Sequence, residues 1–210
     1  MIVSHQHRFI FWKPHKVAST SVLAALAHHC GPNDSVGGAL DGEYTGERRN
    51  MAAFSHLPTA GNHATPKQIR SVCDFLWGKD IWLCYTRITI VRNPWDRAVS
   101  WWDYANRTLG KNLSFEQALA NSERPYWFTP DGEPWAQITL RYESLNADYE
   151  KLCCDLSLPC QPLQHLRPGS ARRHYSTYYD ARSRDLVARH FDREIEHYHY
   201  SFETAEDVEN

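Results

Sequence analysis

The sequence predicts an α/β fold in which helices flank a central, mainly parallel sheet. Three short segments, 8–12, 86–91 and 137–142, are apolar or β-branched and have the length of buried strands. A segment with the composition or apolar spacing of a helix follows each of them. Strands that alternate with helices in this way form parallel sheets whose faces the helices cover.

Length and composition predict one domain that spans residues 1–210. The chain is 42% hydrophobic and 23% charged, and it is long enough to bury a core without disulfides or a structural metal. The formal net charge is −2, so the chain lacks the basic balance of a general nucleic-acid binder. We therefore expect no nucleic-acid partner, and any site for an anion must be local.

Composition places one predicted helix, and capping signals place two others. The segment 20–29 is rich in Ala and Leu and follows the first strand. In the segment 65–77, Thr65 is the expected N-cap, Pro66 takes the first helical position, and Gln68 completes a capping box. Asn93 caps a further helix after the second strand.

The remaining segments complete the predicted fold. After the third strand, an apolar face marks another helix, and a final helix is expected over about 181–197. The polar, glycine-rich segment 31–50 is expected to be a long surface loop.

The cysteines and the first residues of the chain indicate the cellular compartment that we expect. The six cysteines lack CxxC spacing, which predicts free thiols in a reducing compartment. The first residues show no basic stretch followed by an apolar one, so no signal peptide is expected. No apolar run approaches the ~18 residues that span a bilayer. We therefore expect a cytoplasmic protein without a membrane span, whose oligomeric state the sequence leaves open.

A first candidate anion site lies in Lys13-Pro-His-Lys-Val-Ala-Ser-Thr-Ser21, between a predicted strand and a predicted helix. Unpaired N–H groups at a helix start attract anions, Lys16 adds a positive charge, and three consecutive hydroxyls add donors. The segment lacks the glycines of the GxxxxGK[ST] loop, which disfavours a nucleoside triphosphate. Taken alone, the pattern also fits an ordinary capped helix beside a lysine.

A second candidate anion site lies in Val91-Arg-Asn-Pro-Trp-Asp-Arg-Ala-Val-Ser100, which also joins a strand to a helix. The helical repeat brings Ser100 to the side of the loop that holds Arg92. The guanidinium of Arg92 can bind a phosphate through its planar fork, and Ser100 can donate a second bond. The alternative is a salt-bridged arginine near a surface serine.

Together the two segments resemble the donor-binding motifs of sulfotransferases that use 3′-phosphoadenosine-5′-phosphosulfate (PAPS). The segment 16–21 resembles the loop for the 5′-phosphosulfate, and the segment 91–100 resembles the one for the 3′-phosphate. The resemblance is closest to the branch of carbohydrate-type and bacterial enzymes, sulfotransferase family 2, and extends over roughly 8–202. It implies a P-loop-like three-layer fold and transfer of a sulfuryl group from PAPS to an acceptor hydroxyl.

The resemblance also implies which residues hold PAPS. A late basic segment, 170–175, is expected to fold over the donor, and a solvated basic loop is its alternative. The implied donor-binding residues are Lys16, Val17, Ala18, Ser19, Thr20, Ser21, Arg92, Ser100, Ser170, Arg172, Arg173 and Tyr175.

Attack by a hydroxyl requires a base, for which neutral histidine is suited near pH 7. His63 lies two residues before the Thr65 cap, where the helix dipole disfavours the imidazolium, and the resemblance places a functional histidine there. His56 is the second candidate, because its segment resembles that of another sulfotransferase branch. Lys16 is expected to stabilise charge on the leaving phosphate. The scheme requires no metal, and the histidine pairs lack zinc-site spacing.

Two other functions stay open. A P-loop kinase-like phosphotransferase shares the fold class, but the sequence offers neither a Walker lysine–hydroxyl pair nor a magnesium carboxylate after a strand. The second open function is that of a non-catalytic module that binds adenosine 3′,5′-bisphosphate (PAP) or a glycan. The acceptor, expected to be a carbohydrate or a small-molecule alcohol, would meet loops at 31–60 and 103–135, lined by Tyr126-Trp-Phe128 and Trp135.

Overall fold

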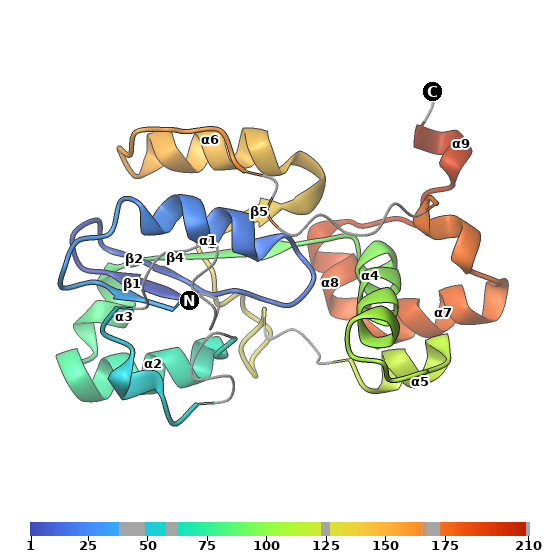
Figure 1. Ribbon diagram of the computed structural model, residues 1–210, viewed down its shortest axis with the longest axis horizontal. Coiled ribbons are helices and arrows are strands. Elements are labelled where there is room, and N and C mark those ends of the chain that lie inside the picture. The colour runs from blue at the N-terminus through green and yellow to red at the C-terminus, as the bar shows by residue number, and fades with distance from the viewer. Residues whose placement is uncertain (38–48, 58–62, 123–126, 165, 167–172, 209–210) are drawn as a thin grey trace. The chain divides into compact units, whose positions relative to one another are not determined.

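The structure is a computed structural model, shown as a ribbon in Figure 1. The residues that it describes are 1–37, 49–57, 63–122, 127–164, 166 and 173–208.

The chain packs as two compact units. The first comprises Met1–Val91 and Tyr126–Arg167, and the second comprises Arg92–Pro125 and Pro168–Asn210. The expectation of one domain over 1–210 therefore stays a prediction.

The first unit contains a mixed sheet, with five strands in the described residues. The order across the sheet is β3-β1-β2-β4-β5. The strands are β1 (Ile2–Ser4), β2 (Phe9–Phe11), β3 (Ser35–Val36), β4 (Thr86–Val91) and β5 (Ile138–Arg141). The α/β class and the three expected strands, β2, β4 and β5, are confirmed, and these three run parallel.

The prediction of a mainly parallel sheet is wrong, because β1 pairs antiparallel with both β2 and β3. Only a short turn joins β1 to β2, and a short connection forces neighbouring strands to run antiparallel. Both β1 and β3 are too short to show a two-residue period in the sequence. The parallel centre of the sheet thus carries an antiparallel edge.

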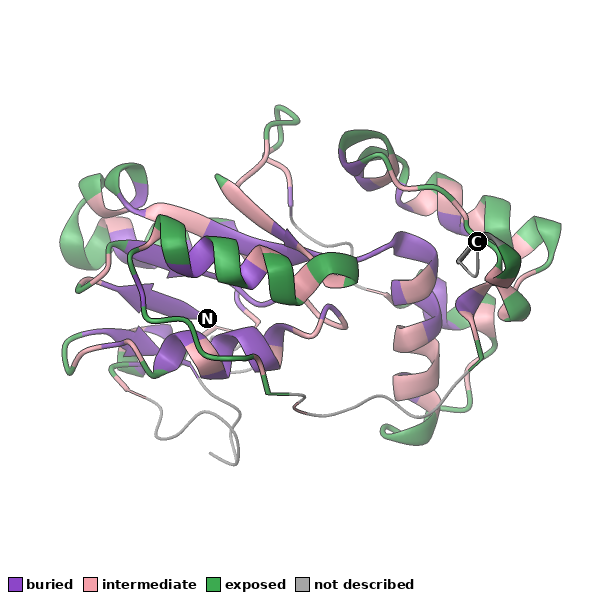
Figure 2. Cartoon of the chain, turned by 90° about the horizontal axis from the view of Figure 1, so that it is seen from above, coloured by how far each residue is buried: buried purple, intermediate pink, exposed green. Residues whose placement is uncertain are grey.

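Helices cover both faces of this sheet. Figure 1 shows α1 (Ser19–Ala27) and α6 (Leu145–Asp155) on one side, and α2 (Pro66–Trp77) and α3 (Asp80–Cys84) on the other. Every residue of β1 and β2 is buried, which fits their largely apolar sequence, and Figure 2 shows buried strands in purple.

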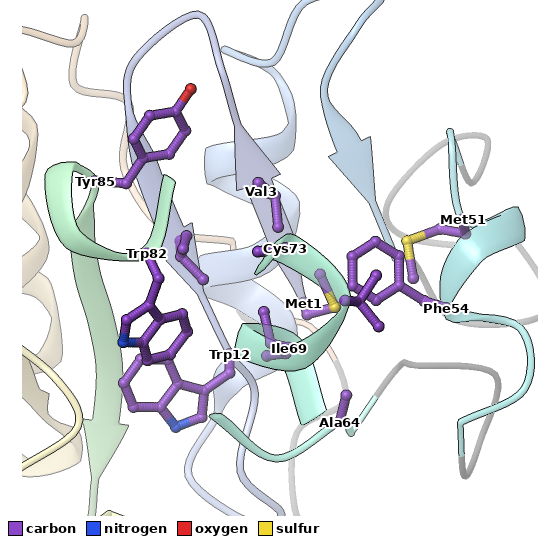
Figure 3. Packing of buried hydrophobic residues seen from close by; sticks show 12 residues of the cluster. Met1, Val3, Trp12, Met51, Phe54, Ala64, Ile69, Cys73, Trp82 and Tyr85 are labelled. Atoms are coloured by element: carbon purple, nitrogen blue, oxygen red, sulfur yellow. The ribbon is translucent and has the colours of Figure 1, made fainter. Parts of the chain in front are cut away.

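The core under α2 and α3 draws its side chains from strands and helices alike (Figure 3). Val3 pairs with Ile10 in the sheet, and both point into this cluster. The cluster comprises Met1, Val3, Ile10, Trp12, Met51, Phe54, Ala64, Ile69, Val72, Cys73, Trp82 and Tyr85. Because Trp12 follows β2 directly and Ala64 precedes α2, this packing brings the chain after β2 close to the chain before α2.

Helix α2 begins at the predicted position. The Thr65 hydroxyl accepts a hydrogen bond from the Gln68 N–H at 3.3 Å, and the Gln68 side chain accepts one from the Thr65 N–H at 2.8 Å. Pro66 takes the first helical position. This capping box fixes where the helix starts, with its N-cap two residues after His63.

The C-terminal end of α1 is held by an arginine and an aspartate. Arg49 donates to the carbonyls of Ala27 and Cys30, each at 3.1 Å, which satisfies backbone acceptors at the helix end. The buried Asp34 accepts hydrogen bonds from the N–H groups of the loop after the helix and of the turn after β1. The bonds of Asp34 anchor the loop after α1 to the turn after β1.

The second unit is helical in its described residues. It contains α4 (Pro94–Arg107), α5 (Phe115–Ala120), η4 (Tyr175–Tyr178), α7 (Ala181–His190), α8 (Asp192–Tyr198) and α9 (Ala205–Val208). Asn93 caps α4 by accepting a bond from the Trp95 N–H at 3.1 Å, which confirms the predicted helix start.

The expected helix over 181–197 is wrong in one respect, because the chain leaves helical geometry at Phe191. Phe191 has φ −122° and ψ 33°, and its ring is buried. The guanidinium of Arg97 lies 4.4 Å from the centre of that ring. A tertiary contact of this kind is invisible in helical periodicity, so the sequence predicted one helix where there are two.

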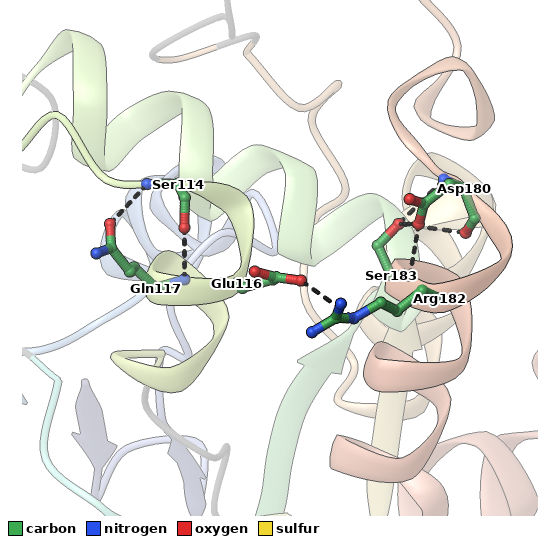
Figure 4. A network of polar contacts seen from close by, with 6 residues as sticks. All are labelled: Ser114, Glu116, Gln117, Asp180, Arg182 and Ser183. Atoms are coloured by element: carbon green, nitrogen blue, oxygen red, sulfur yellow. Dashed lines mark hydrogen bonds and ion pairs between the residues drawn. The ribbon is translucent and has the colours of Figure 1, made fainter.

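Polar contacts at helix starts complete this unit (Figure 4). Ser114 and Gln117 form a capping box for α5, and Asp180 and Ser183 form one for α7. Arg182 lies 3.5 Å from the Glu116 carboxylate and links the two helices. Because both of these side chains are largely exposed, the ion pair adds little stability.

Candidate functional site

The turn before α1 has a strained backbone. Lys16 has φ +63° and Ala18 has φ +57°, left-handed values that glycine adopts readily and other residues rarely. Each costs about 1–2 kcal/mol and persists only where the surrounding structure enforces it. Within the described part of the chain, no side chain caps the start of α1. The turn therefore presents backbone N–H groups at a positive helix end, which suits an anion.

The hydroxyls that follow this turn have different partners. The buried Ser19 hydroxyl donates to the Pro14 carbonyl at 2.9 Å, so its proton closes the turn. The Ser21 hydroxyl accepts from the Leu166 N–H at 3.3 Å and keeps its own proton to donate. Thr20, between them, is half-buried. The side chain of Val17 lies in the core, so this residue can offer a ligand only its backbone.

His63 packs against the same turn. The distance between its Nδ1 and the Lys13 carbonyl oxygen is 2.8 Å. Because a carbonyl only accepts, Nδ1 carries the proton of the neutral ring and Nε2 carries the lone pair. Burial, and to a smaller extent the charges of His15 and Lys13, together lower the pKa of His63 to about 3. The imidazole is therefore neutral at pH 7, with Nε2 as its basic atom.

The alternative base, His56, lies in a different setting. It is exposed and follows the short helix η1 (Ala52–Phe54). Phe54 anchors that helix in the core, whereas His56 lies on the solvent side. His63, in contrast, contacts the turn of Lys16 through the Lys13 carbonyl and the His15 ring.

In the second unit, Arg92 is paired with an acid. Its Nε and Nη2 lie 2.6 and 2.5 Å from Oδ2 of Asp96, one turn into α4. Arg92 is buried and Ser100 is half-buried, and Asp96 and Ser100 are four residues apart on one helix face. The salt-bridged arginine weighed from the sequence is thus what the structure contains. Asp96 engages one edge of the guanidinium and leaves its other N–H groups to other partners.

The late basic segment is described only in part. Ser170 and Arg172 lie outside the described residues. Arg173 is exposed, whereas the ring of Tyr175 is buried. The Tyr175 hydroxyl accepts a bond from the Glu203 N–H at 2.8 Å, so it holds the C-terminal segment in place.

The aromatic residues that were predicted to face the acceptor have different surroundings. Tyr126 lies outside the described residues. Trp127 is 1% exposed and donates to the Ile90 carbonyl at 3.2 Å, so it is a core residue and its expected place in an acceptor wall is wrong. Trp135 packs edge-to-face on Trp82, with ring centres 5.8 Å apart. The expected loop over 103–135 is helical through the end of α4 and in α5.

Comparison with known proteins identifies the family. The model of the sulfotransferase family matches residues 1–151, which is well over half of the chain. The chain belongs to the sulfotransferase family. The resemblance to sulfotransferase family 2 is confirmed, and the enzyme is a transferase of sulfuryl groups. Neither the curated proteins nor the solved structures gave a match.

The family match covers some of the expected site residues of this sulfotransferase and leaves others outside it. Lys16, His63, Arg92 and Ser100 lie inside the matched range, whereas the late basic segment lies beyond it. Among the described residues, no group of three His, Cys, Asp or Glu side chains is placed to hold a metal ion. In the same part of the chain, no helix is long and apolar enough to cross a membrane.

One feature of the sulfotransferase site escaped sequence reasoning. His15 stacks on His63, with ring centres 3.6 Å apart and planes 18° apart. The elements α1, β3 and η1 lie between the two residues in the chain, so no local spacing connects them. The one available signal was the place of His15 inside a turn already singled out for Lys16.

Proposed function

We propose that this sulfotransferase takes its sulfuryl group from PAPS and transfers it in line to an acceptor hydroxyl of a carbohydrate or small-molecule alcohol. In this P-loop-like scheme, the turn from Lys13 to Ala18 takes the place of a glycine-rich loop and binds the 5′-phosphosulfate. Arg92 and Ser100 bind the 3′-phosphate, with Arg173 and the neighbouring Ser170 and Arg172 as further contacts. The observation that carries the proposal is the bond from His63 Nδ1 to the Lys13 carbonyl, which joins a neutral base to the donor turn.

Strand topology supports the arrangement. The turn of Lys16 follows β2, and Arg92 follows β4 in the chain. Strands β2 and β4 are parallel neighbours, with Phe11 opposite Ile88. Ligands of open α/β sheets bind at the carboxyl ends of such strands. The two segments proposed to bind the phosphates of the donor thus each follow, in the chain, one of two neighbouring parallel strands.

The proposed step moves one proton and one sulfuryl group. The acceptor oxygen forms a bond to sulfur while the bond from sulfur to the bridging phosphate oxygen breaks. The acceptor proton passes to Nε2 of His63, and PAP departs. Lys16 stabilises the charge that develops on the bridging oxygen.

The low pKa of His63 in the unliganded protein fits this role once the donor is considered. A base with a pKa of about 3 stays neutral but removes protons weakly. PAPS brings several negative charges to a turn that carries Lys13, His15 and Lys16. Negative charge favours the imidazolium, so donor binding raises the pKa of His63 toward the working range.

Calorimetry with PAP and a PAPS-consumption screen against acceptor libraries test the proposal. We expect PAP to bind and at least one hydroxyl acceptor to be sulfated. His63→Ala should lower turnover about 10²- to 10⁴-fold with PAP affinity nearly unchanged. The same loss in His56→Ala, with His63→Ala fully active, would transfer the role of base to His56. Absence of PAP binding would refute the proposal, and binding without sulfation would favour a non-catalytic module.

A further inference from the structure

The turn from Lys13 to Lys16 makes two separate contacts with the His63 ring. The first is the hydrogen bond from Nδ1 to the Lys13 carbonyl, at 2.8 Å. The second is the face-to-face stack of His15, whose ring centre lies 3.6 Å from that of His63. The residue that follows His15 is Lys16, with its left-handed backbone. The base and the donor turn are therefore joined by a backbone contact and a side-chain contact.

The two contacts restrict different motions of the ring. The terminal torsion of a histidine side chain has a broad energy well, so the plane of an imidazole is easily tilted. A single hydrogen bond fixes the direction of Nδ1 but permits rotation about that bond. A second ring at 3.6 Å, with only 18° between the planes, blocks the tilt. Together, the hydrogen bond and the stacked ring restrict the Nε2 lone pair to one direction.

We propose that His15 is a positioning residue that holds the ring plane of His63, so that Nε2 faces the acceptor hydroxyl. The inference rests on the proposed role of His63 as general base. Proton transfer requires the base within hydrogen-bond reach and correctly aligned, so loss of the stack lowers the rate and spares donor binding.

The charge of His15 gives the pair a second, measurable property. The groups that lower the pKa of His63 by their charge are His15, Lys13 and the chain's amino terminus. All three are positive when protonated, so each disfavours a second positive charge on the His63 ring. Replacing His15 by an uncharged ring therefore raises the pKa of His63 while keeping the stack.

Kinetics of two variants separate positioning from general structure. His15→Ala removes the ring, and we expect kcat to fall at least about tenfold while KM for PAPS stays within about twofold. His15→Phe restores a stacking ring, and kcat should return to within about threefold of wild type. His28→Ala, at an exposed position after α1, is the matched control and should keep wild-type kinetics.

Nitrogen-15 NMR of the His63 side chain in the unliganded protein provides a readout that does not depend on turnover. Wild type should show a proton on Nδ1 and none on Nε2, His15→Ala should show exchange between ring states, and His15→Phe should show a higher pKa of His63. Unchanged kcat and unchanged His63 signals in His15→Ala would overturn the inference. Equal losses of kcat and PAP affinity would overturn it too, because His15 would then support the turn alone. If wild type sulfates no acceptor, the proposed function fails, and the NMR result decides whether His15 orients His63.

Discussion

Arg92 is bound through two of its nitrogens, Nε and Nη2, to a single carboxylate oxygen of Asp96. Arg92 is buried just before α4, and Asp96 lies in the first turn of that helix. Two nitrogens that share one acceptor oxygen restrain the guanidinium plane, and the N–H groups on its other edge keep a defined direction. The ion pair is thus compatible with an arginine held ready for a phosphate.

Removal of Arg92 should cost affinity for the 3′-phosphate alone. We expect Arg92→Ala to weaken PAP binding about 10- to 100-fold, as for loss of charged hydrogen bonds worth ~1.5–3 kcal/mol. Binding of adenosine 5′-phosphosulfate, which lacks the 3′-phosphate, should change less than about twofold. Calorimetry with the two nucleotides measures both affinities.

Arg107 offers a matched control for this experiment. It lies at the end of the same helix and forms the same type of pair, with its Nε 2.6 Å from Asp103. Arg107→Ala should leave the affinities for both nucleotides unchanged. An equal loss of affinity for both nucleotides in Arg92→Ala would contradict a specific 3′-phosphate contact.

Relief of backbone strain at Ala18 should stabilise the protein. Glycine adopts φ +57° without the clash that alanine meets, so Ala18→Gly should raise the free energy of unfolding by about 1 kcal/mol. PAP affinity should be retained, because the turn keeps its shape. Urea unfolding and calorimetry check the two expectations.

The same substitution within α1 is the control. Ala24 lies in the helix interior, where glycine costs roughly 0.8–1 kcal/mol, so Ala24→Gly should destabilise the protein. The explanation by strain fails if both variants lose stability alike.

The depressed pKa of His63 predicts a loss of stability in acid. The folded protein holds this ring neutral down to about pH 3, whereas the unfolded chain binds the proton near pH 6.5. Between these values the unfolded state binds more protons, so the free energy of unfolding falls as pH decreases from 6.5 toward 3. In His63→Gln this fall should be less steep, as measured by urea unfolding at several pH values.

A surface histidine tests whether the effect belongs to His63. His28 is exposed after α1, so His28→Ala should keep the wild-type dependence of stability on pH. Identical slopes for His63→Gln and wild type would show that the ring is not held neutral in the folded protein.

Asp34 should be a main determinant of stability in the first unit. Its carboxylate accepts bonds from the Ser4 hydroxyl and from the N–H groups of His5, Gln6 and Gly31, at 2.7–3.2 Å. Burial raises the pKa of Asp34, but these bonds outweigh it and hold the pKa below its usual value. Asp34→Ala leaves buried donors without acceptors and should cost about 3 kcal/mol in urea unfolding.

The exposed Asp131 provides the comparison for Asp34. It lies in a surface turn, where loss of a carboxylate usually changes stability by less than about 0.5 kcal/mol. A similarly small effect of Asp34→Ala would mean that the carboxylate does not anchor the loop after α1 to the turn after β1.

Local sequence was sufficient for the features that depend on neighbouring residues. Thr65 and Gln68 predicted the start of α2, and Asn93 predicted the start of α4, because a cap bonds to groups within its own turn. The strands β2, β4 and β5 were predicted for a similar reason, since apolar and β-branched residues are concentrated within each short segment.

The sequence by itself determined the α/β class, the helix starts and the family motifs. Only the tertiary structure decided the antiparallel edge at β1, the break at Phe191 and the partner of the His63 ring. Each of these depends on residues that are distant in the chain or on the packing of a side chain against another element. Periodicity and capping report forces within one turn of backbone, whereas the stack of His15 on His63 exists because the sheet and α2 bring two separate segments together.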